Sequence, residues 1–137
     1  MEKAPDLTQM FLYDKFPIWY EYCHETQAIT LADVILSGEP YPIKALYGVG
    51  MNFKMYPQTD KLVKALDQID FFVNTDLFMT YTSKFADIVL PCCSSLERGE
   101  FKVYPGGYGV YTKPVIQPLY ESKSDTDILC ELARYME

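Results

Sequence analysis

Residues 71–91, FFVNTDLFMTYTSKFADIVLP, place the strongest constraint on what this chain can fold into. The segment begins with one short apolar run, FFV, and ends with a second, IVL, which stops at Pro91. Two such runs joined by a short helical stretch are typical of strands in a parallel α/β unit. We expect Asn74, Thr75 and Asp76 just past the carboxyl end of the first strand. Ligands bind there in open α/β sheets, so Asp76 is a candidate binding residue.

The chain before this segment continues the alternation of helices and strands. Thr30 to Asp33 has the pattern of a capping box, which predicts a short helix that stops at Gly38. An apolar run over residues 43–49 predicts a strand, and helical periodicity predicts a helix over 59–68. The order predicts an α/β fold, with an open, mainly parallel sheet and helices on both faces in a three-layer, Rossmann-like arrangement.

The pattern changes after Pro91. Residues 100–104 are expected to be extended, 105–109 to form a glycine-rich turn and 110–112 to be a hairpin partner, which makes 100–118 a hairpin or irregular segment. A second capping box, Ser124 to Asp127, opens a final helix. The helix carries an apolar stripe, formed by Ile128, Leu129, Leu132, Ala133 and Met136.

Residues 1–28 are dense in aromatic side chains and have no clear period. They are predicted to form an aromatic N-terminal arm, which either packs on the body of the protein or meets a partner that this chain lacks. No linker interrupts residues 29–137, so these are predicted to form a single α/β domain.

Composition narrows the possible functions. The chain has 137 residues, of which 49% are hydrophobic and 23% charged, as in globular proteins. Its net charge of −7 disfavours nucleic acid as a partner. No apolar run approaches the roughly 20 residues that span a membrane, so no membrane contact is expected from this segment. No targeting signal is visible in the sequence.

The four cysteines and the single histidine do not have the spacing of a zinc or iron–sulfur site. Cys23, Cys92, Cys93 and Cys130 are therefore expected to be buried free thiols. A catalytic pair of Cys23 and His24 is conceivable, but partners in such pairs are normally distant in sequence.

Several segments in order resemble the molybdopterin oxidoreductases of the dimethyl-sulfoxide-reductase type. They are TDLFMTYT at 75–82, ADIVLP at 86–91 and ERG at 97–99, preceded by GEPYPIKAL at 38–46 and GMN at 50–52. The tail is also similar, because KSD at 123–125 opens a helix that contains ELA at 131–133. The resemblance covers about residue 30 to the end.

The resemblance implies one internal cofactor-binding domain of a longer multidomain enzyme. The family carries a bis(molybdopterin guanine dinucleotide) cofactor with molybdenum or tungsten, and often an iron–sulfur cluster. This domain type holds the guanosine and phosphate end of one of the two dinucleotides. The implied partners are the remaining domains of the same enzyme and possible electron-transfer subunits. The family's cysteine run, metal ligand and β-barrel are not in this sequence, so the fragment alone is expected to be inactive.

The resemblance also implies which residues bind the cofactor. The carboxylate of Asp76 could accept two hydrogen bonds from the N1–H and N2–H edge of guanine. Arg98 could pair with phosphate or stack on the base, and Asp125 could be a second contact for the nucleoside. The implied cofactor-binding residues are Met51, Asn52, Thr75, Asp76, Arg98 and Asp125.

Other interpretations stay open at the level of sequence. Asp76 could be a solvated loop acid, and Asp125 could serve only the dipole of the last helix. Arg98 could be a surface cation paired with Glu97 or Glu100. The alternative is a free-standing nucleotide-binding module or a protein-interaction module without redox chemistry.

Overall fold

The computed structural model describes residues 16–18, 22, 25 and 27–136. The aromatic arm predicted at 1–28 therefore lies mostly outside the described residues. The α-helices and strands are α2 (Leu31–Ser37), β1 (Ala45–Val49), α3 (Thr59–Leu66), β2 (Phe71–Asp76), β3 (Ile88–Pro91), β4 (Glu100–Tyr104), β5 (Tyr108–Thr112) and α4 (Asp125–Met136). Short 3-10 helices are η2 (Ala28–Thr30), η3 (Phe53–Met55) and η4 (Thr82–Phe85).

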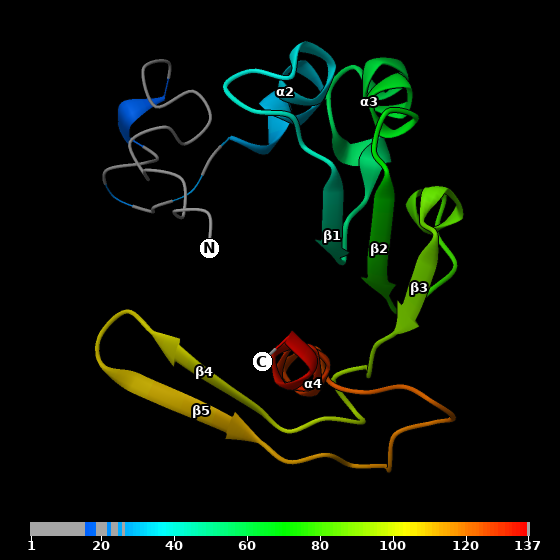
Figure 1. The fold of residues 1–137 in the computed structure, drawn as a ribbon. Coiled ribbons are helices and arrows are strands. Elements are labelled where there is room, and N and C mark those ends of the chain that lie inside the picture. The colour runs from blue at the N-terminus through cyan, green and yellow to red at the C-terminus, as the bar shows by residue number, and fades with distance from the viewer. Residues whose placement is uncertain (1–15, 19–21, 23–24, 26, 137) are drawn as a thin grey trace. The chain divides into compact units, whose positions relative to one another are not determined.

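The strands form a three-stranded sheet and a separate hairpin. The sheet has the order β1-β2-β3, and its strands run parallel (Figure 1). Strands β4 and β5 form an antiparallel pair, in which Phe101 faces Tyr111 and Tyr104 faces Tyr108. The predicted α/β class, the parallel sheet and the hairpin within 100–118 are confirmed.

The chain divides into two compact units. The first comprises Met1–Leu46 and Asn52–Phe72, and the second comprises Tyr47–Met51 and Val73–Glu137. Each unit is therefore described by itself. The single domain expected over 29–137 stays a prediction.

The core of the first unit lies between α2, α3 and η3. Helix α3 buries Leu62, Ala65 and Leu66, and α2 packs against it. Phe53, at the start of η3, is fully buried, and its ring stacks on Phe72 with centroids 6.0 Å apart. The buried face of α3 is thus matched by an aromatic pair that the sequence analysis did not single out.

The ends of α2 were predicted with mixed success. The predicted capping box at its start is wrong, because no side chain caps this helix end. Thr30 instead donates its hydroxyl hydrogen to the carbonyl of Gln27, 2.7 Å away, within the preceding 3-10 turn. The predicted stop at Gly38 is confirmed, since Gly38 has φ +67° and donates its N–H to Val34. Glycine adopts this left-handed backbone conformation without the steric strain that a Cβ would cause.

Strand β2 is longer than predicted. Asn74, Thr75 and Asp76 belong to the strand rather than to the loop after it. They pair in parallel with Val89, Leu90 and Pro91 of β3, and Asn74 and Thr75 are buried. Polar side chains inside a buried strand need partners within the protein. The sheet therefore carries a polar network at its carboxyl edge.

The last helix begins as predicted. Ser124 accepts a hydrogen bond from the backbone N–H of Asp127, 3.1 Å away, and donates its own hydroxyl to that residue's carboxylate. The predicted N-cap at Ser124 is thereby confirmed, whereas the carboxylate of Asp127 is bonded to the Ser124 hydroxyl in place of the backbone N–H that a capping box uses. Of the predicted apolar stripe, Ile128 is buried, whereas Leu129, Leu132 and Met136 are exposed. In the part of the chain that the structure describes, no helix is long and apolar enough to cross a membrane.

Candidate cofactor-binding site

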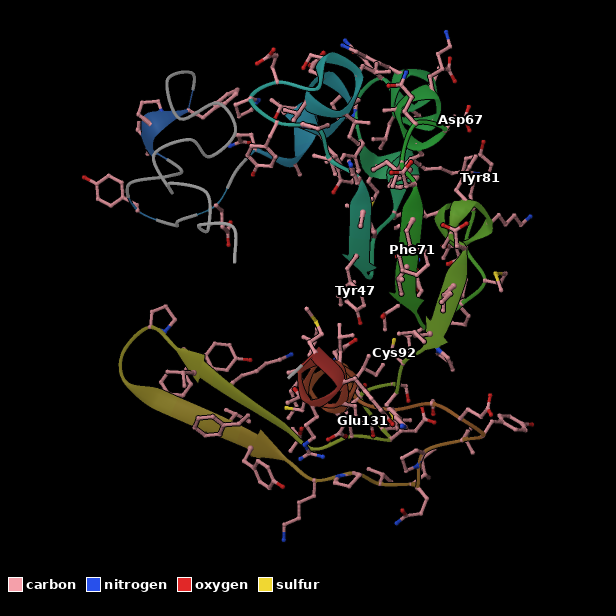
Figure 2. The ribbon with its side chains drawn as sticks, viewed as in Figure 1. Tyr47, Asp67, Phe71, Tyr81, Cys92 and Glu131 are labelled. Atoms are coloured by element: carbon pink, nitrogen blue, oxygen red, sulfur yellow. The ribbon has the colours of Figure 1, made fainter. Side chains whose placement is uncertain are left out.

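Two strand ends are joined by hydrogen bonds at the carboxyl edge of the sheet. The hydroxyls of Tyr47 and Thr75 lie 2.9 Å apart, and Gly50 donates its N–H to the carbonyl of Thr75 at 2.8 Å. Thr75 is only 1% exposed. The hydroxyl of Thr75 thus holds β1 against β2 through Tyr47, a partner that the sequence analysis missed. Figure 2 labels Tyr47 on β1.

Asp76 is the last residue of β2, and its carboxylate can accept more hydrogen bonds than the chain supplies. One carboxylate oxygen accepts the N–H of Phe78 and the other accepts the hydroxyl of Thr80, each at 3.3 Å. Both bonds are long, and each carboxylate oxygen has two lone-pair directions. The side chain is half-buried rather than fully solvated. Asp76 is therefore oriented by its own loop while it can still accept further hydrogen bonds.

A buried polar network supports the loop that follows Asp76. Asn74 donates to Ser83 at 3.0 Å, and the hydroxyls of Ser83 and Thr80 lie 2.9 Å apart. The Oδ1 of Asn74 is buried without a hydrogen-bond partner. A Cβ at Gly48 would lie 2.7 Å from this oxygen, so any other residue there would force the Asn74 side chain to shift. The spacing of hydroxyl residues at 80–83 was the available sequence signal for this network.

Arg98 and Asp125 form an ion pair through Nη1 and Oδ2, and Arg98 also approaches Glu100 at 3.4 Å. About a quarter of each side chain of the pair is exposed, at 25% and 28%. The Nε of Arg98 and the Oδ1 of Asp125 are buried and have no hydrogen-bond partner. The pair therefore leaves one buried donor and one buried acceptor unsatisfied.

Cys92, labelled in Figure 2, follows β3 and lies within electrostatic reach of these residues. Burial raises the pKa of its thiol, and the negative charges of Asp125 and Asp76 raise it further. Arg98 acts in the opposite direction on the same pKa. The charges of three of the predicted binding residues thus act on the pKa of one thiol.

The thiols are expected to react with iodoacetamide in a fixed order at pH 8. Cys130 is exposed and should be alkylated several times faster than Cys92, whose raised pKa leaves little reactive thiolate. Cys93 is buried and should react slowest. Peptide mapping by mass spectrometry would measure the rates. Asp125→Asn should speed alkylation of Cys92 and leave Cys130 unchanged, and equal rates at Cys92 and Cys130 in the unmodified chain would contradict this environment.

The exposure of Cys130 corrects the prediction that the cysteines are buried. Cys93 is buried and Cys92 half-buried, and all three of these thiols are free. Cys130 lies on the exposed side of α4, where its position is set by helical periodicity. Cys23 and His24 lie outside the described residues. Among the residues that are described, no group of three or more His, Cys, Asp or Glu side chains could hold a metal ion.

Met51 and Asn52 follow β1 but belong to different units. Met51 lies against Gly48, since a Cβ there would be 3.2 Å from its sulfur. Asn52 belongs to the first unit, where its side chain accepts the N–H of Lys54 at 3.2 Å and caps η3. Gly50, between the strand and Met51, has φ +58° and no atom within 4 Å of an added Cβ. The backbone at Gly50 is therefore open to close approach by a ligand.

Glu97 is a buried carboxylate that the sequence analysis did not assign to the site. It accepts hydrogen bonds from Ser94, Leu119 and Ser122. The bonds from Ser94 and the N–H of Leu119 lower its pKa to about 2. The stability it contributes is present above its ordinary pKa, near 4.5, and is lost as the pH falls through about 2. Glu97 is therefore ionised at neutral pH.

Comparison with known proteins identifies the family. A family model described as molybdopterin oxidoreductase matches residues 26–135. The chain belongs to the molybdopterin oxidoreductase family. The matched segment of this molybdopterin oxidoreductase domain includes all six residues that were predicted to bind cofactor.

Individual relatives agree with the family model. The domain is 34% identical over 127 residues to dopamine dehydroxylase of Eggerthella lenta, an alignment that covers 90% of this chain and 12% of that protein. It is 35% identical over 96 residues to the dimethyl sulfoxide/trimethylamine N-oxide reductase of Rhodobacter capsulatus, with 66% and 12% covered. The resemblance to the dimethyl-sulfoxide-reductase type is thereby confirmed.

A solved structure supports the same fold. Acetylene hydratase from Pelobacter acetylenicus matches with a TM-score of 0.70 and 33% identity. The match covers 77% of this chain and 15% of that one. The molybdopterin oxidoreductase domain described here thus spans only a small part of the length of the relatives it matches.

Proposed function

We propose that this domain binds the guanosine and phosphate end of a molybdopterin guanine dinucleotide, within a longer molybdenum or tungsten oxidoreductase. The observation that carries the proposal is the Arg98–Asp125 pair, whose Nε and Oδ1 are buried without partners. Buried polar atoms cost free energy unless a hydrogen bond satisfies them. A nucleoside with donors and acceptors of its own fits this arrangement.

Each residue has a distinct part in the proposed site. Asp76 accepts hydrogen bonds from the guanine N1–H and N2–H, because its carboxylate retains acceptor capacity. Arg98 donates through Nε, and Asp125 accepts through Oδ1 from the nucleoside. Met51 and Gly50 line the end of β1, where the backbone is open to a phosphate or ribose. Asn52, which the sequence also predicts to bind the dinucleotide, belongs to the first unit, and its role stays a separate prediction.

Thr75 has a supporting part in this proposal. Its hydroxyl is bonded to Tyr47 and its carbonyl accepts from Gly50, so it fixes the strand ends that flank Asp76. The redox chemistry belongs to the metal end of the bound cofactor, which supplies two-electron transfer outside the residues of this chain. The chain's own contribution is to bind and orient the nucleotide end.

Titration of the full 137-residue chain with GDP, IDP and ADP tests the proposal. We expect GDP to bind more tightly than IDP, because inosine lacks the N2 amino group that donates to Asp76. Loss of one hydrogen bond to a charged group should weaken binding about tenfold or more. ADP, which presents the wrong edge, should bind more weakly still.

Isothermal titration calorimetry gives the three affinities, and amide shifts at Thr75, Asp76 and Asp125 would locate the site. Equal affinities for GDP and ADP would contradict a guanine-specific site. So would the absence of binding at millimolar GDP.

A further inference from the structure

Glu97 joins two segments that are distant in sequence. Its Oε2 accepts the N–H of Ser94 at 2.8 Å, which closes the turn that leads to Arg98. Its Oε1 accepts the N–H of Leu119 at 2.8 Å and the hydroxyl of Ser122 at 3.3 Å. The residue is only 9% exposed. One carboxylate therefore ties residues 94–98 to residues 119–122.

The two segments carry the ion pair of the proposed site. Arg98 is the next residue after Glu97, and Asp125 follows Ser122 by three positions. The 119–125 segment is also held to the end of β3, because Cys93 donates to the carbonyl of Lys123 at 2.8 Å. That backbone contact joins the 119–125 segment to the residue just before Ser94. The carbonyl of Leu96 also joins this turn to the later segment, because it accepts the N–H of Val115 and of Ile116. Glu97 adds the side-chain contacts that join the turn to Leu119 and Ser122.

We propose that Glu97 is a positioning residue, whose carboxylate holds Arg98 and Asp125 in the arrangement that binds the nucleoside. This inference rests on the proposed function. Glu97 does not contact the ligand in this role, because both of its oxygens accept hydrogen bonds from the chain itself. Its effect on binding passes through the Arg98–Asp125 pair.

Glu97→Gln tests whether the role of Glu97 depends on its hydrogen bonds or only on the volume of its side chain. Glutamine has the same shape but replaces one carboxylate oxygen with an NH2 group, which cannot accept from a backbone N–H. Either Ser94 or Leu119 would then face a donor instead of an acceptor. Glu121→Gln is the matched control, since Glu121 is exposed and lies in the same 119–122 segment.

The first readout needs no ligand. An ion pair slows rotation of the guanidinium group, so the Nη protons of Arg98 should be resolved in NMR spectra of the full chain. We expect Glu97→Gln to lose these signals and to exchange the Leu119 amide more than tenfold faster, while Glu121→Gln leaves both unchanged. Persistence of the Arg98 signals in a folded Glu97→Gln chain would overturn the inference.

The second readout is the affinity for GDP. It is measured only for variants that circular dichroism shows to be folded. Glu97→Gln should weaken GDP binding about tenfold, as loss of supporting hydrogen bonds does at other binding sites. If the unsubstituted chain binds GDP and Glu97→Gln binds it with the same affinity, the inference is overturned and the proposed function stands. If the unsubstituted chain binds no GDP, the proposed function fails, and the Arg98 signals still decide the role of Glu97.

Ser122→Ala covers the case in which Glu97→Gln does not fold. This variant keeps the carboxylate and removes the Ser122 hydroxyl, which lies 3.3 Å from Oε1 of Glu97 and 2.7 Å from the carbonyl oxygen of Leu119. We expect the same loss of Arg98 signals and of GDP affinity, by a smaller factor. Behaviour identical to the unsubstituted chain in both readouts would overturn the inference.

Discussion

Asp76→Ala is expected to abolish the preference of the chain for GDP over ADP. The proposed contact consists of two hydrogen bonds from guanine to a carboxylate, and bonds to charged groups contribute about 1.5–3 kcal/mol each. Removing both should weaken GDP binding by about a hundredfold or more, whereas ADP binding should change little. Calorimetric titration of both nucleotides into the variant measures the two constants.

Asp67→Ala is the control for Asp76→Ala. Asp67 follows α3, is exposed and carries the same charge, but it belongs to the first unit. This variant should keep the full ratio of GDP to ADP affinity. IDP sharpens the comparison, because the difference between GDP and IDP should also vanish in Asp76→Ala. A variant at Asp76 that retained the guanine preference would refute the role given to this carboxylate.

Phe53→Ala is expected to cause the largest loss of stability in the first unit. The ring is 0% exposed, stacks on Phe72 and meets Tyr56 edge-on with centroids 6.3 Å apart. Replacing a buried phenylalanine by alanine removes apolar contact and leaves a cavity, which costs about 3–5 kcal/mol. Domains of this size are stable by about 5–15 kcal/mol, so the variant should be close to unfolding.

Urea denaturation followed by circular dichroism would measure this loss. Met55→Ala is the matched control, because Met55 lies in the same 3-10 helix and is 80% exposed. Its replacement should change the free energy of unfolding by less than about 0.5 kcal/mol. A loss below about 1 kcal/mol for Phe53→Ala would mean that the pocket around the ring does not behave as a packed core.

Much of the secondary structure could be predicted because its signals are local. The apolar run before residue 74 begins β2, and the run after residue 87 lies in β3. Gly38 ends α2, and Ser124 caps α4. The capping box at Thr30 was wrong for an equally local reason. A 3-10 turn precedes α2 and takes the threonine hydroxyl, so the same residue pattern served a different backbone.

The contacts of the predicted site residues could be foreseen only in part. The family motif indicated Asp76, Arg98 and Asp125, and the last two form an ion pair in the structure. Nothing in the sequence indicated that Tyr47 bonds to Thr75 or that Glu97 bonds to Ser122. These contacts join residues 28 and 25 positions apart, so no local period or turn rule encodes them.

The sequence by itself determined the α/β class, the hairpin, the last helix and the family, because periodicity, turn residues and motif order are properties of short segments. It also placed an acid at the carboxyl end of β2. Only the tertiary structure decided which polar groups form hydrogen bonds within the protein and which have no partner there. The Thr75 hydroxyl is bound by Tyr47, whereas Arg98 and Asp125 keep one unpartnered atom each. Hydrogen-bond partners depend on where the folded chain brings distant segments together, and that path is set by packing of the whole unit.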